Sequence, residues 1–474
     1  MKPDRERTLG GRMRRIEPAA PGGEQGALKD EHDPFAEIKA LAQAEAVREL
    51  GTALNEGEVV EEELHEQVQR AIDAALAEAG TPLSTRDRAR LVREITHNIL
   101  GYGPIEPFLA DDTVTEVMVN NHSTIYVERK GMIEETDIRF GSELHLLQVI
   151  DRIVAQTGRR IDESSPMVDA RLPDGSRVNA IIPPLAITGP SLTIRKFSRE
   201  PLTMDNLVGF GTLSHQAAAF LEACVSGKLN VLVSGGTGTG KTTMLNVLSS
   251  FIPERERIIT IEDAAELKLS QRHVIALEAR PPNTEGRGAI SIRDLVRNAL
   301  RMRPDRIVVG ECRGPEAVDM LQAMNTGHDG SLTTIHANSP RDALARTETL
   351  VLTAGFDMPL KAIRDQISSA FDLVIQTNRL VDGRRRITHI TEVGGMEGDI
   401  ITLQDVFVAS FADDKEPDNS TSKLVYTGIR PAFIEKLERH GVTLPKTFFG
   451  DTSANIDVLR RGPRAPGGRQ RRTA

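Results

Sequence analysis

The chain has 474 residues and a formal net charge of −9, and hydrophobic residues make up 39% of it. This balance predicts a globular protein of several domains and excludes a collagen-like or globally disordered chain. The absence of Trp and an aromatic content of 4% argue against a stacking platform for single-stranded nucleic acid. The sequence holds no run of 18 apolar residues and only two cysteines, Cys224 and Cys312. We therefore expect a cytoplasmic protein without a signal peptide or a membrane span.

The N-terminal region divides into a tail and a helical segment. Residues 1–33 are rich in Gly, Pro, Arg and Glu without periodicity, so we expect a disordered tail. Apolar residues then recur at every fourth position from Val60 to Leu76, which predicts a helical bundle over residues 34–110. The acidic composition of this bundle indicates a solvated face, or alternatively a docking surface for a basic partner.

A second pattern begins at Val114, where the hydrophobic period changes to two. The pair Asp174-Gly175 is a hairpin signal, and a helical stretch over 142–157 interrupts the strands. Together these features predict a small α+β domain over residues 111–197. A linker is expected over residues 198–211.

Apolar strand-like runs alternate with helical patterns over residues 212–400. This alternation is typical of βαβ units on a mostly parallel sheet, so we expect an α/β domain there. A C-terminal α/β extension is predicted over residues 401–459. Residues 460–474 hold six Arg and no acidic residue, and we expect a basic disordered tail. Such a tail either associates with an anionic membrane or only adds solubility.

The segment from Gly235 to Thr242 matches the P-loop pattern G-x-x-x-x-G-K-[ST] at every fixed position and directly follows an apolar strand-like run. In such a loop the glycines let backbone N–H groups converge on phosphate oxygens. Lys241 supplies a positive charge to the β- and γ-phosphates, and the Thr242 hydroxyl is a ligand for Mg²⁺. The pattern predicts a RecA-like P-loop NTPase domain that uses ATP and Mg²⁺. The residues expected to bind the nucleotide are Gly235, Gly236, Thr237, Gly238, Thr239, Gly240, Lys241, Thr242 and Thr243.

Hydrolysis also needs a carboxylate that positions water and completes the metal shell. Glu311 ends one apolar run without the usual metal-binding Asp, and Glu262 ends another. We expect both to act in catalysis or in the metal shell, directly or through water, beside Thr242. The alternative is that each acidic residue only caps a helix.

Two further groups are less specific by themselves. His328 and His336 are eight residues apart with no cysteine nearby in sequence, which disfavours zinc, and in isolation each is better read as a structural histidine. Arg293, Arg297 and Arg301 recur at every fourth position. Residue type alone favours a solvated or subunit-facing stripe for them.

Taken in order, these motifs resemble one family, the bacterial secretion traffic ATPases of type II secretion, type IV pili and type IV secretion. Four segments carry the resemblance, as Walker A, Asp box, Walker B and His box: 235–242, 260–263, 301–311 and 325–338. The sequence is most similar to the CpaF-type branch, which assembles tight-adherence (Flp) pili. Residues 174–179, 193–197 and 392–398 also fit that branch. The resemblance implies a PAS-like fold for the small domain over residues 111–197.

The resemblance implies a homohexamer that binds inner-membrane platform proteins and works at the cytoplasmic face of the inner membrane, with possible peripheral membrane association and no obligate nucleic acid. In that family Arg177 and Arg195 would reach the phosphates from the N-terminal domain, as arginine fingers do. Glu311 would direct the attacking water, Glu262 would support the metal or the water, and His336 and His328 would sense the γ-phosphate. No zinc is expected, because the Cys-rich motifs of many type II secretion ATPases are absent.

The function that follows is an ATP-hydrolysing motor for pilus assembly or protein secretion. A type IV secretion or conjugation ATPase is the alternative within the family. A RecA-like nucleic-acid motor is the alternative from another class, and the net charge and low aromatic content count against it. A scaffold with an inactive nucleotide site is disfavoured because Lys241, Thr242, Glu262 and Glu311 are all present.

Overall fold

The computed structural model describes residues 84–99, 101–129, 131–157, 159–197, 201–282, 287–380, 382–410 and 423–449, and a few single residues between 66 and 77. The chain divides into two compact units, one ending at Glu106 and the other beginning at Pro107. The tails predicted over 1–33 and 460–474 lie outside the described residues, as does most of the helical bundle.

The described part of the first unit consists of helix α3 (Thr85–Ile99) and a 3₁₀ turn, η1 (Gly103–Ile105). The helix begins after Ser84, whose hydroxyl accepts a hydrogen bond from the Asp87 N–H at 3.1 Å. Such a bond satisfies one of the free N–H groups at a helix start. Because most of residues 34–83 lie outside the described part of the chain, the bundle predicted over residues 34–110 stays a prediction.

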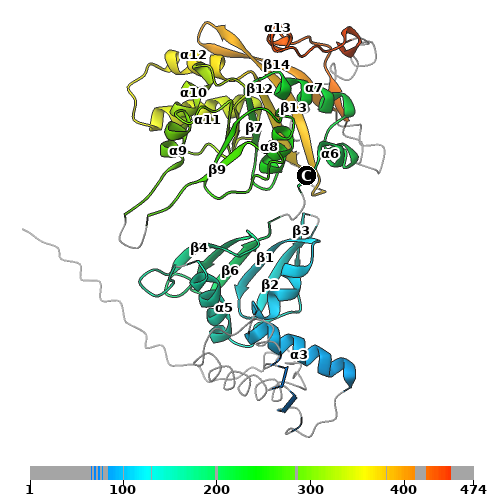
Figure 1. Ribbon diagram of the computed structural model, residues 1–474, viewed down its shortest axis with the longest axis vertical. Coiled ribbons are helices and arrows are strands. Elements are labelled where there is room, and N and C mark those ends of the chain that lie inside the picture. The colour runs from blue at the N-terminus through cyan, green and yellow to red at the C-terminus, as the bar shows by residue number, and fades with distance from the viewer. Residues whose placement is uncertain are drawn as a thin grey trace, which may run out of the picture. The chain divides into compact units, whose positions relative to one another are not determined.

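The second unit begins with helix α4 (Glu106–Ala110), which crosses the boundary, and a six-stranded sheet (Figure 1). The strands are β1 (Val114–Asn121), β2 (Thr124–Arg129), β3 (Met132–Glu135), β4 (Met167–Arg171), β5 (Arg177–Ile181) and β6 (Ser191–Arg195). Their order is β3-β2-β1-β6-β5-β4, and all neighbours are antiparallel. Alternate residues such as Val117 and Ile194 are buried, and so are apolar residues of helix α5 (Glu143–Ala155). The opposite sheet face is thereby left to charged side chains.

A nine-stranded sheet forms the larger part of the unit. Its strands are β7 (Val231–Gly235), β8 (Ile258–Glu262), β9 (Val274–Glu278), β10 (Arg306–Val309), β11 (Leu332–Ile335), β12 (Leu373–Arg379), β13 (Arg385–Glu397), β14 (Ile400–Ser410) and β15 (Lys423–Tyr426). The order is β15-β14-β13-β12-β7-β11-β10-β8-β9. The strands from β12 to β9 are parallel, and β13, β14 and β15 are antiparallel. Because parallel strands with crossover helices bury both faces, the central strands are continuous apolar runs.

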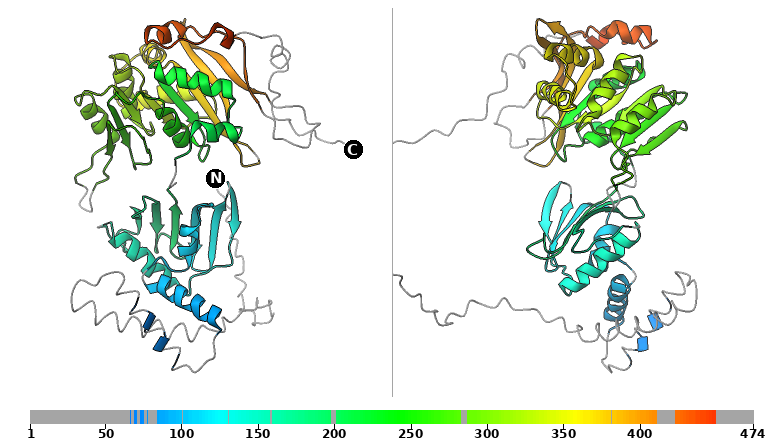
Figure 2. Two further views of the ribbon diagram at one scale, coloured as in Figure 1. Left: turned by 45° about the vertical axis from the view of Figure 1, so that its right-hand side comes forward. Right: turned by 90° about the vertical axis from the view of Figure 1, so that its left-hand side faces the viewer.

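Helices cover both faces of this sheet (Figure 1, Figure 2). They are α6 (Met204–Gly209), α7 (His215–Ser226), α8 (Lys241–Ser249), α9 (Ile292–Ala299), α10 (Glu316–Asn325), α11 (Pro340–Thr353), α12 (Leu360–Ala370) and α13 (Ile434–Arg439), with a 3₁₀ turn, η3 (Lys446–Phe449), near the end of the described chain. Val231 and Val233 of β7 pack in one core with α7, α8 and α13. Leu232 between them packs in another with α10, α11 and α12. This doubly covered parallel sheet with a P-loop after β7 confirms the predicted α/β, RecA-like fold class.

Two boundaries differ from the sequence-based division. The expected linker over 198–211 contains helix α6, whose first turn is closed by a reciprocal capping box between Thr203 and Asn206. The division expected after residue 400 falls at the start of β14, which pairs with β13 in one continuous sheet. Ladder hydrogen bonds thus join the segment 401–410 to the nine-stranded sheet.

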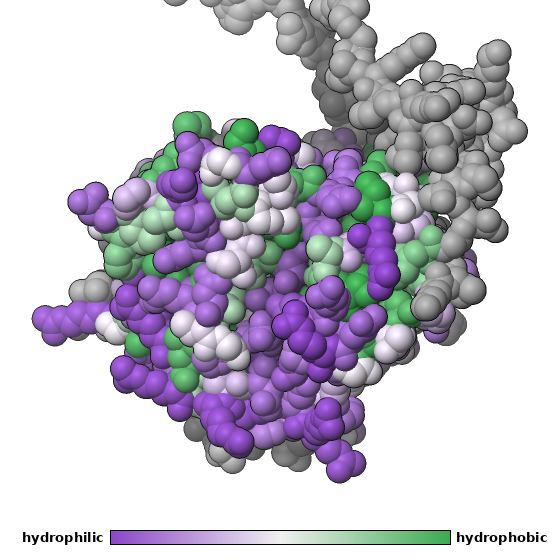
Figure 3. Space-filling view, turned by 90° about the horizontal axis from the view of Figure 1, so that it is seen from above, coloured by the Kyte–Doolittle hydropathy of each residue, from purple (hydrophilic) through white to green (hydrophobic). Residues whose placement is uncertain are grey.

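No helix in the described part of the chain is long and apolar enough to cross a membrane. Figure 3 shows one face on which hydrophilic side chains predominate and hydrophobic ones form small separate patches.

Candidate active site

The P-loop joins β7 to α8 at the carboxyl edge of the parallel sheet. Gly238 and Gly240 have φ values of 70° and 92°, in the left-handed region that favours glycine. Lys241 opens helix α8, and Thr242 and Thr243 follow in its first turn. A helix start with free N–H groups is a site where phosphate oxygens bind.

Hydroxyl groups on the adjacent strand β12 and within the loop itself fix the conformation of the P-loop. The Thr377 hydroxyl on β12 donates to the carbonyl of Ser234 at 3.0 Å and lies 3.0 Å from the Thr239 hydroxyl. The Thr239 hydroxyl in turn donates to the carbonyl of Gly236 at 2.9 Å. Thr377 carries no motif, so sequence reasoning missed its role in bracing the loop.

Lys241 lies among partners that come from distant strands. Its Nζ donates to the Gly236 carbonyl at 2.9 Å and lies 3.2 Å from Nε2 of His336. Burial lowers the pKa of Lys241 to about 8, although the Glu311 carboxylate opposes this shift. The ammonium group is therefore poorly solvated and favours an anionic partner.

Glu311 and His336 meet at the ends of adjacent strands. Oε1 of Glu311 lies 2.9 Å from Nε2 of His336, and Oε2 lies 2.6 Å from Nη2 of Arg313. Burial alone would raise the pKa of Glu311, but Arg313, His336 and Lys241 together hold it below its usual value. Burial and the Lys241 charge lower the pKa of His336. The arrangement keeps an ionised carboxylate beside a neutral imidazole at neutral pH.

Topology explains this meeting. β10 ends at Val309 and β11 ends at Ile335, and both run parallel to β7, so Glu311 and His336 emerge at the same edge as the P-loop. The Thr334 hydroxyl donates to the Gly310 carbonyl at 2.8 Å and ties the two strand ends together.

Glu262 ends β8 and is 4% exposed. Its Oε1 accepts backbone hydrogen bonds from Glu266 at 3.0 Å and Leu267 at 3.2 Å. Burial raises the pKa of Glu262 to about 7 in spite of these bonds. A Cβ atom on Gly310 would lie 2.7 Å from Cγ of Glu262, so glycine is required for this close approach. In this structure Glu262 shapes the loop after β8, next to the strand end that carries Glu311.

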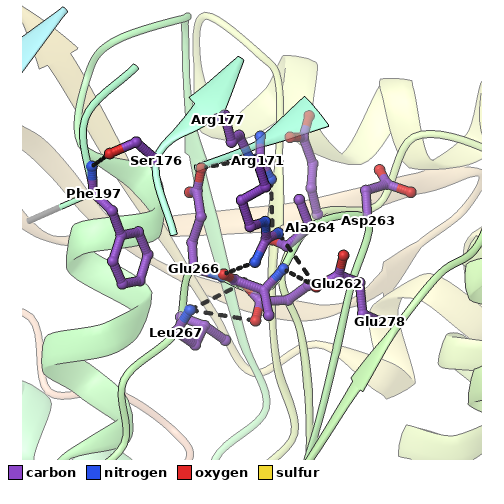
Figure 4. A network of polar contacts seen from close by, with 12 residues as sticks. Arg171, Ser176, Arg177, Phe197, Glu262, Asp263, Ala264, Glu266, Leu267 and Glu278 are labelled. Carbon is purple, nitrogen blue, oxygen red and sulfur yellow. Dashed lines mark hydrogen bonds and ion pairs between the residues drawn. The ribbon is translucent and has the colours of Figure 1, made fainter. Parts of the chain in front are cut away.

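The charged face of the six-stranded sheet supplies Arg177 and Arg195, which are cross-strand partners on β5 and β6. Nη2 of Arg177 donates to the Ala264 carbonyl at 3.0 Å, and its Nε lies 3.1 Å from Oε1 of Glu266 (Figure 4). Arg195 is exposed, and its charge contributes to lowering the pKa of Lys241. Arg177 thus lies beside the loop after Glu262, and the charge of Arg195 acts on Lys241.

Arg171 on β4 extends this row and was missed by sequence reasoning. It is the cross-strand partner of Arg177. Its Nη1 donates to the Ala265 carbonyl at 3.3 Å, and Nη2 lies 3.2 Å from the Glu278 carboxylate. The three arginines line a cavity of about 1160 Å³ together with Asp263 and Arg313. Period-two placement on one sheet face is the signal that would have found Arg171.

The structure does not bring His328 into this site. His328 precedes β11 whereas His336 follows it, so the two histidines lie at opposite edges of the parallel sheet. Nδ1 of His328 lies 3.3 Å from the Ala323 carbonyl, and Asp329 next to it pairs with Lys436 at 3.2 Å. The structure therefore places His328 away from the P-loop of the same chain, and its role at the γ-phosphate stays a prediction.

The arginines of α9 do not form the solvated stripe that residue type alone favours. Arg293 and Arg297 each place Nε 2.7 Å from the carboxylate of Asp319, which is 5% exposed. These two arginines therefore pair within the chain rather than forming a purely solvated face. Arg301 lies beyond the end of the helix.

The residues present fit an ion held jointly with a nucleotide. Oε1 of Glu311 is buried and makes no hydrogen bond of acceptable geometry, although His336 lies close to it. In the described ranges no three His, Cys, Asp or Glu side chains gather to hold a metal by themselves. Mg²⁺ characteristically takes one or two protein ligands and completes its shell with phosphates and water. The Thr242 hydroxyl at the start of α8 and the ionised Glu311 carboxylate suit that pattern.

Comparison with known proteins decides the family. Residues 99–400 match the model of the family described as type II/IV secretion system protein. The chain belongs to the type II/IV secretion ATPase family. The superfamily predicted from the motifs is thereby confirmed, and membership in the tight-adherence branch stays a prediction.

Relatives of this secretion ATPase come from several bacteria. A Mycobacterium tuberculosis protein named for conjugal transfer is 38% identical over 313 residues, which cover 65% of this chain and 88% of that protein. The conjugal transfer protein TrbB of Rhizobium radiobacter is 30% identical and covers 66% of this chain and 92% of its own length. The type IV secretion system protein PtlH of Bordetella pertussis is 34% identical, with 60% and 92% covered.

Proposed function

We propose that this protein hydrolyses ATP and uses the energy to drive a type II/IV secretion or pilus system. The observation that carries the proposal is the chain of contacts from Lys241 through His336 to Glu311. It links the phosphate-binding lysine to a carboxylate that is held ionised. This is the pair of functions that phosphoryl transfer to water requires.

The roles follow from position. Lys241 would neutralise the β- and γ-phosphates, and the Thr242 hydroxyl would bind Mg²⁺. Glu311 would orient the attacking water, because its Oε1 is buried beside the P-loop and lacks a well-formed hydrogen bond. Glu262 would support the water or metal from behind Gly310, and His336 would respond to the γ-phosphate.

Arg177 and Arg195 would stabilise the negative charge that develops on the transferred phosphoryl group. Arg177 is held by Glu266 and the Ala264 carbonyl, whereas Arg195 is exposed and its charge contributes to lowering the pKa of Lys241. Exposed Arg195 is therefore the better placed to contact a phosphate, and Arg177 orients the loop after Glu262.

A second cavity adjoins the P-loop and would accept the base. It has a volume of about 360 Å³ and is lined by Leu207, Phe210, Gly240, Met244 and Arg384, among others. Apolar walls with a few polar groups are typical of a site for a planar heterocycle. Adenine next to Gly240 would leave the phosphates over the P-loop.

At the level of the whole assembly, we propose a homohexamer at the cytoplasmic face of the inner membrane, bound to platform proteins of the system. ATP hydrolysis would remove the γ-phosphate contacts and so permit rigid-body rotation of one domain against another. Assembly of a tight-adherence pilus remains the first candidate, on the motifs of residues 174–179, 193–197 and 392–398.

A type IV secretion or conjugation motor is the second candidate. It is supported by the relatives from Mycobacterium, Rhizobium and Bordetella, which carry conjugal transfer or type IV secretion names. Deletion of the gene in its host, complemented with wild type or Lys241→Ala, distinguishes the two. Loss of surface pili with normal plasmid transfer supports the pilus motor, and the reverse result supports conjugation.

A further inference from the structure

The β12–β13 hairpin carries two arginines next to the P-loop. Arg379 ends β12 and Arg385 begins β13, and the two are cross-strand partners. Nε of Arg385 donates to the carbonyl of Gly238 at 3.0 Å. A Cβ atom built on Gly238 would lie 3.5 Å from Nη1 of Arg379. Both guanidinium groups therefore border the loop that would bind phosphates.

One carboxylate from the six-stranded sheet faces this arginine pair. Glu128 on β2 is 9% exposed, and its Oε1 accepts a hydrogen bond from the Thr115 hydroxyl at 2.9 Å. Its Oε2 lies 3.7 Å from Nη2 of Arg379, and its Oε1 lies 3.8 Å from Nη2 of Arg385. Arg379 also donates to the carbonyl of Gly131, in the turn after β2. The small sheet is thus connected to the P-loop through charged groups.

The charge around these arginines is unbalanced. Burial lowers the pKa of Arg385, Glu128 raises it, and the neighbouring Arg379 and Arg195 lower it further. Lys241 adds a fourth positive charge, and Arg195 also lowers the pKa of Lys241. A single buried carboxylate shared by two arginines leaves them able to accept another anion. The phosphates of a nucleotide would be that anion, because they bind along the same loop.

We infer that Glu128 competes with nucleotide phosphates for Arg379 and Arg385, and that Arg385, which donates to the Gly238 carbonyl, links the P-loop to β2. The inference rests on the proposed nucleotide site. Phosphates bound to the P-loop draw the arginine pair away from Glu128, so nucleotide binding weakens the contact between the hairpin and the small sheet. Release of the nucleotide restores the contact. Glu128 thereby couples the nucleotide state to the small sheet independently of Arg177 and Arg195.

If Glu128 competes with phosphates, removing its charge changes the nucleotide affinity in the opposite direction from that expected if Glu128 is only structural. If Glu128 only braces the domain, removing its charge leaves two arginines without their partner and weakens both folding and nucleotide binding. If Glu128 competes, removing its charge frees the arginines for phosphate and tightens nucleotide binding. The direction of one affinity change separates the two roles.

The test measures ADP affinity by calorimetry on full-length wild type, Glu128→Gln and a control, Glu135→Gln. Glu135 lies on β3 of the same sheet, is exposed, and accepts a hydrogen bond from the Tyr126 hydroxyl at 3.2 Å. The control therefore removes one negative charge from the same sheet without touching the hairpin arginines. We expect Glu128→Gln to bind ADP about threefold to tenfold more tightly than wild type, as for loss of a partly buried ionic competitor, and Glu135→Gln to bind as wild type does.

Two more variants keep the result decisive. Glu128→Asp withdraws the carboxylate by one methylene and should tighten ADP binding by a smaller factor, so it serves if Glu128→Gln does not fold. Arg385→Lys keeps the charge but loses the donor to Gly238, and it should weaken ADP binding by about threefold to tenfold. In the Glu128→Gln/Arg385→Lys double variant, the gain from removing Glu128 should shrink, because the two residues act on each other.

The outcomes also separate this inference from the proposed function. Wild type that binds neither ADP nor ATP would remove the proposed function itself. Wild type that binds ADP, with folded Glu128 variants that bind it equally or more weakly, would overturn the competition alone. Tighter binding in Glu135→Gln as well would reduce the effect to general electrostatics and overturn the specific role of Glu128.

Discussion

Nε2 of His336 lies 2.9 Å from Oε1 of Glu311, at the ends of two adjacent parallel strands. The same ring nitrogen lies 3.2 Å from Nζ of Lys241. One imidazole therefore contacts both the phosphate-binding lysine and the carboxylate proposed to direct water. A γ-phosphate bound by Lys241 would change the partner of His336 and, through it, the orientation of Glu311.

The first prediction concerns this bridge. His336→Ala should lower kcat by about tenfold to a hundredfold, because Glu311 loses the group that orients it, and should change ADP affinity little. His328→Ala is the matched control, since His328 lies at the opposite edge of the sheet, and it should retain wild-type turnover. Steady-state phosphate release and ADP calorimetry provide both quantities. Equal losses of turnover in the two variants would contradict the placement of these histidines.

The second prediction separates the two carboxylates. Glu311→Gln should retain ATP affinity within about one order of magnitude and lower kcat by roughly a hundredfold or more, because its charge acts mainly in the transition state. Glu262→Gln should be the milder variant, since its carboxylate is already occupied by two backbone N–H groups. Single-turnover assays over a range of Mg²⁺ concentrations measure the order. The reverse order would exchange the two roles.

The third prediction concerns the arginines of the small sheet. Arg195→Ala should leave ADP affinity nearly intact and lower ATP turnover by roughly 10² to 10⁴, because ADP lacks the phosphate that the arginine would stabilise. Arg177→Ala should also lower turnover, and in addition should reduce thermal stability through loss of its contacts with Glu266 and Ala264. Calorimetry, melting and turnover on the same preparations distinguish these effects. Full activity of both variants would remove the small sheet from the active site.

The fourth prediction follows from the pKa of Lys241, which burial lowers to about 8. Below pH 8 the Lys241 side chain of the free enzyme carries the positive charge that binds phosphate, and above pH 8 this charge is lost. At pH 9 only about one lysine in ten remains charged, so ADP affinity should fall by about tenfold between pH 7 and pH 9. The kcat at saturating ATP should fall less, because bound phosphates favour the charged lysine. Lys241→Arg is the control, and its ADP affinity should not follow this profile.

Sequence patterns predicted those parts of the site whose residues are neighbours in the sequence. The P-loop and the acidic residues at the ends of β8 and β10 were predictable because strand, turn and first helical residues adjoin in sequence. The positions of Glu262, Glu311 and His336 at one edge then follow from parallel strand topology. His328 is not part of this group in the structure, because the four-residue strand β11 separates it from His336.

The residues that sequence reasoning missed act through pairings over long separations. Thr377 braces a loop that lies more than a hundred residues earlier, and Arg385 does the same from β13. Glu128 lies beside Arg379 although the two residues belong to different sheets. No local periodicity encodes such contacts, because each depends on the register of strands that are distant in sequence.

The most direct test of the active-site assignment is ATP hydrolysis by the full-length protein and by Lys241→Ala under the same conditions. Lys241 is the residue on which the phosphate contacts, the His336 bridge and the pH dependence all depend. We predict Mg²⁺-dependent phosphate release by wild type and its loss, by about a hundredfold or more, in a Lys241→Ala protein that melts at the wild-type temperature. Turnover within threefold of wild type in that variant would contradict the assignment of the active site.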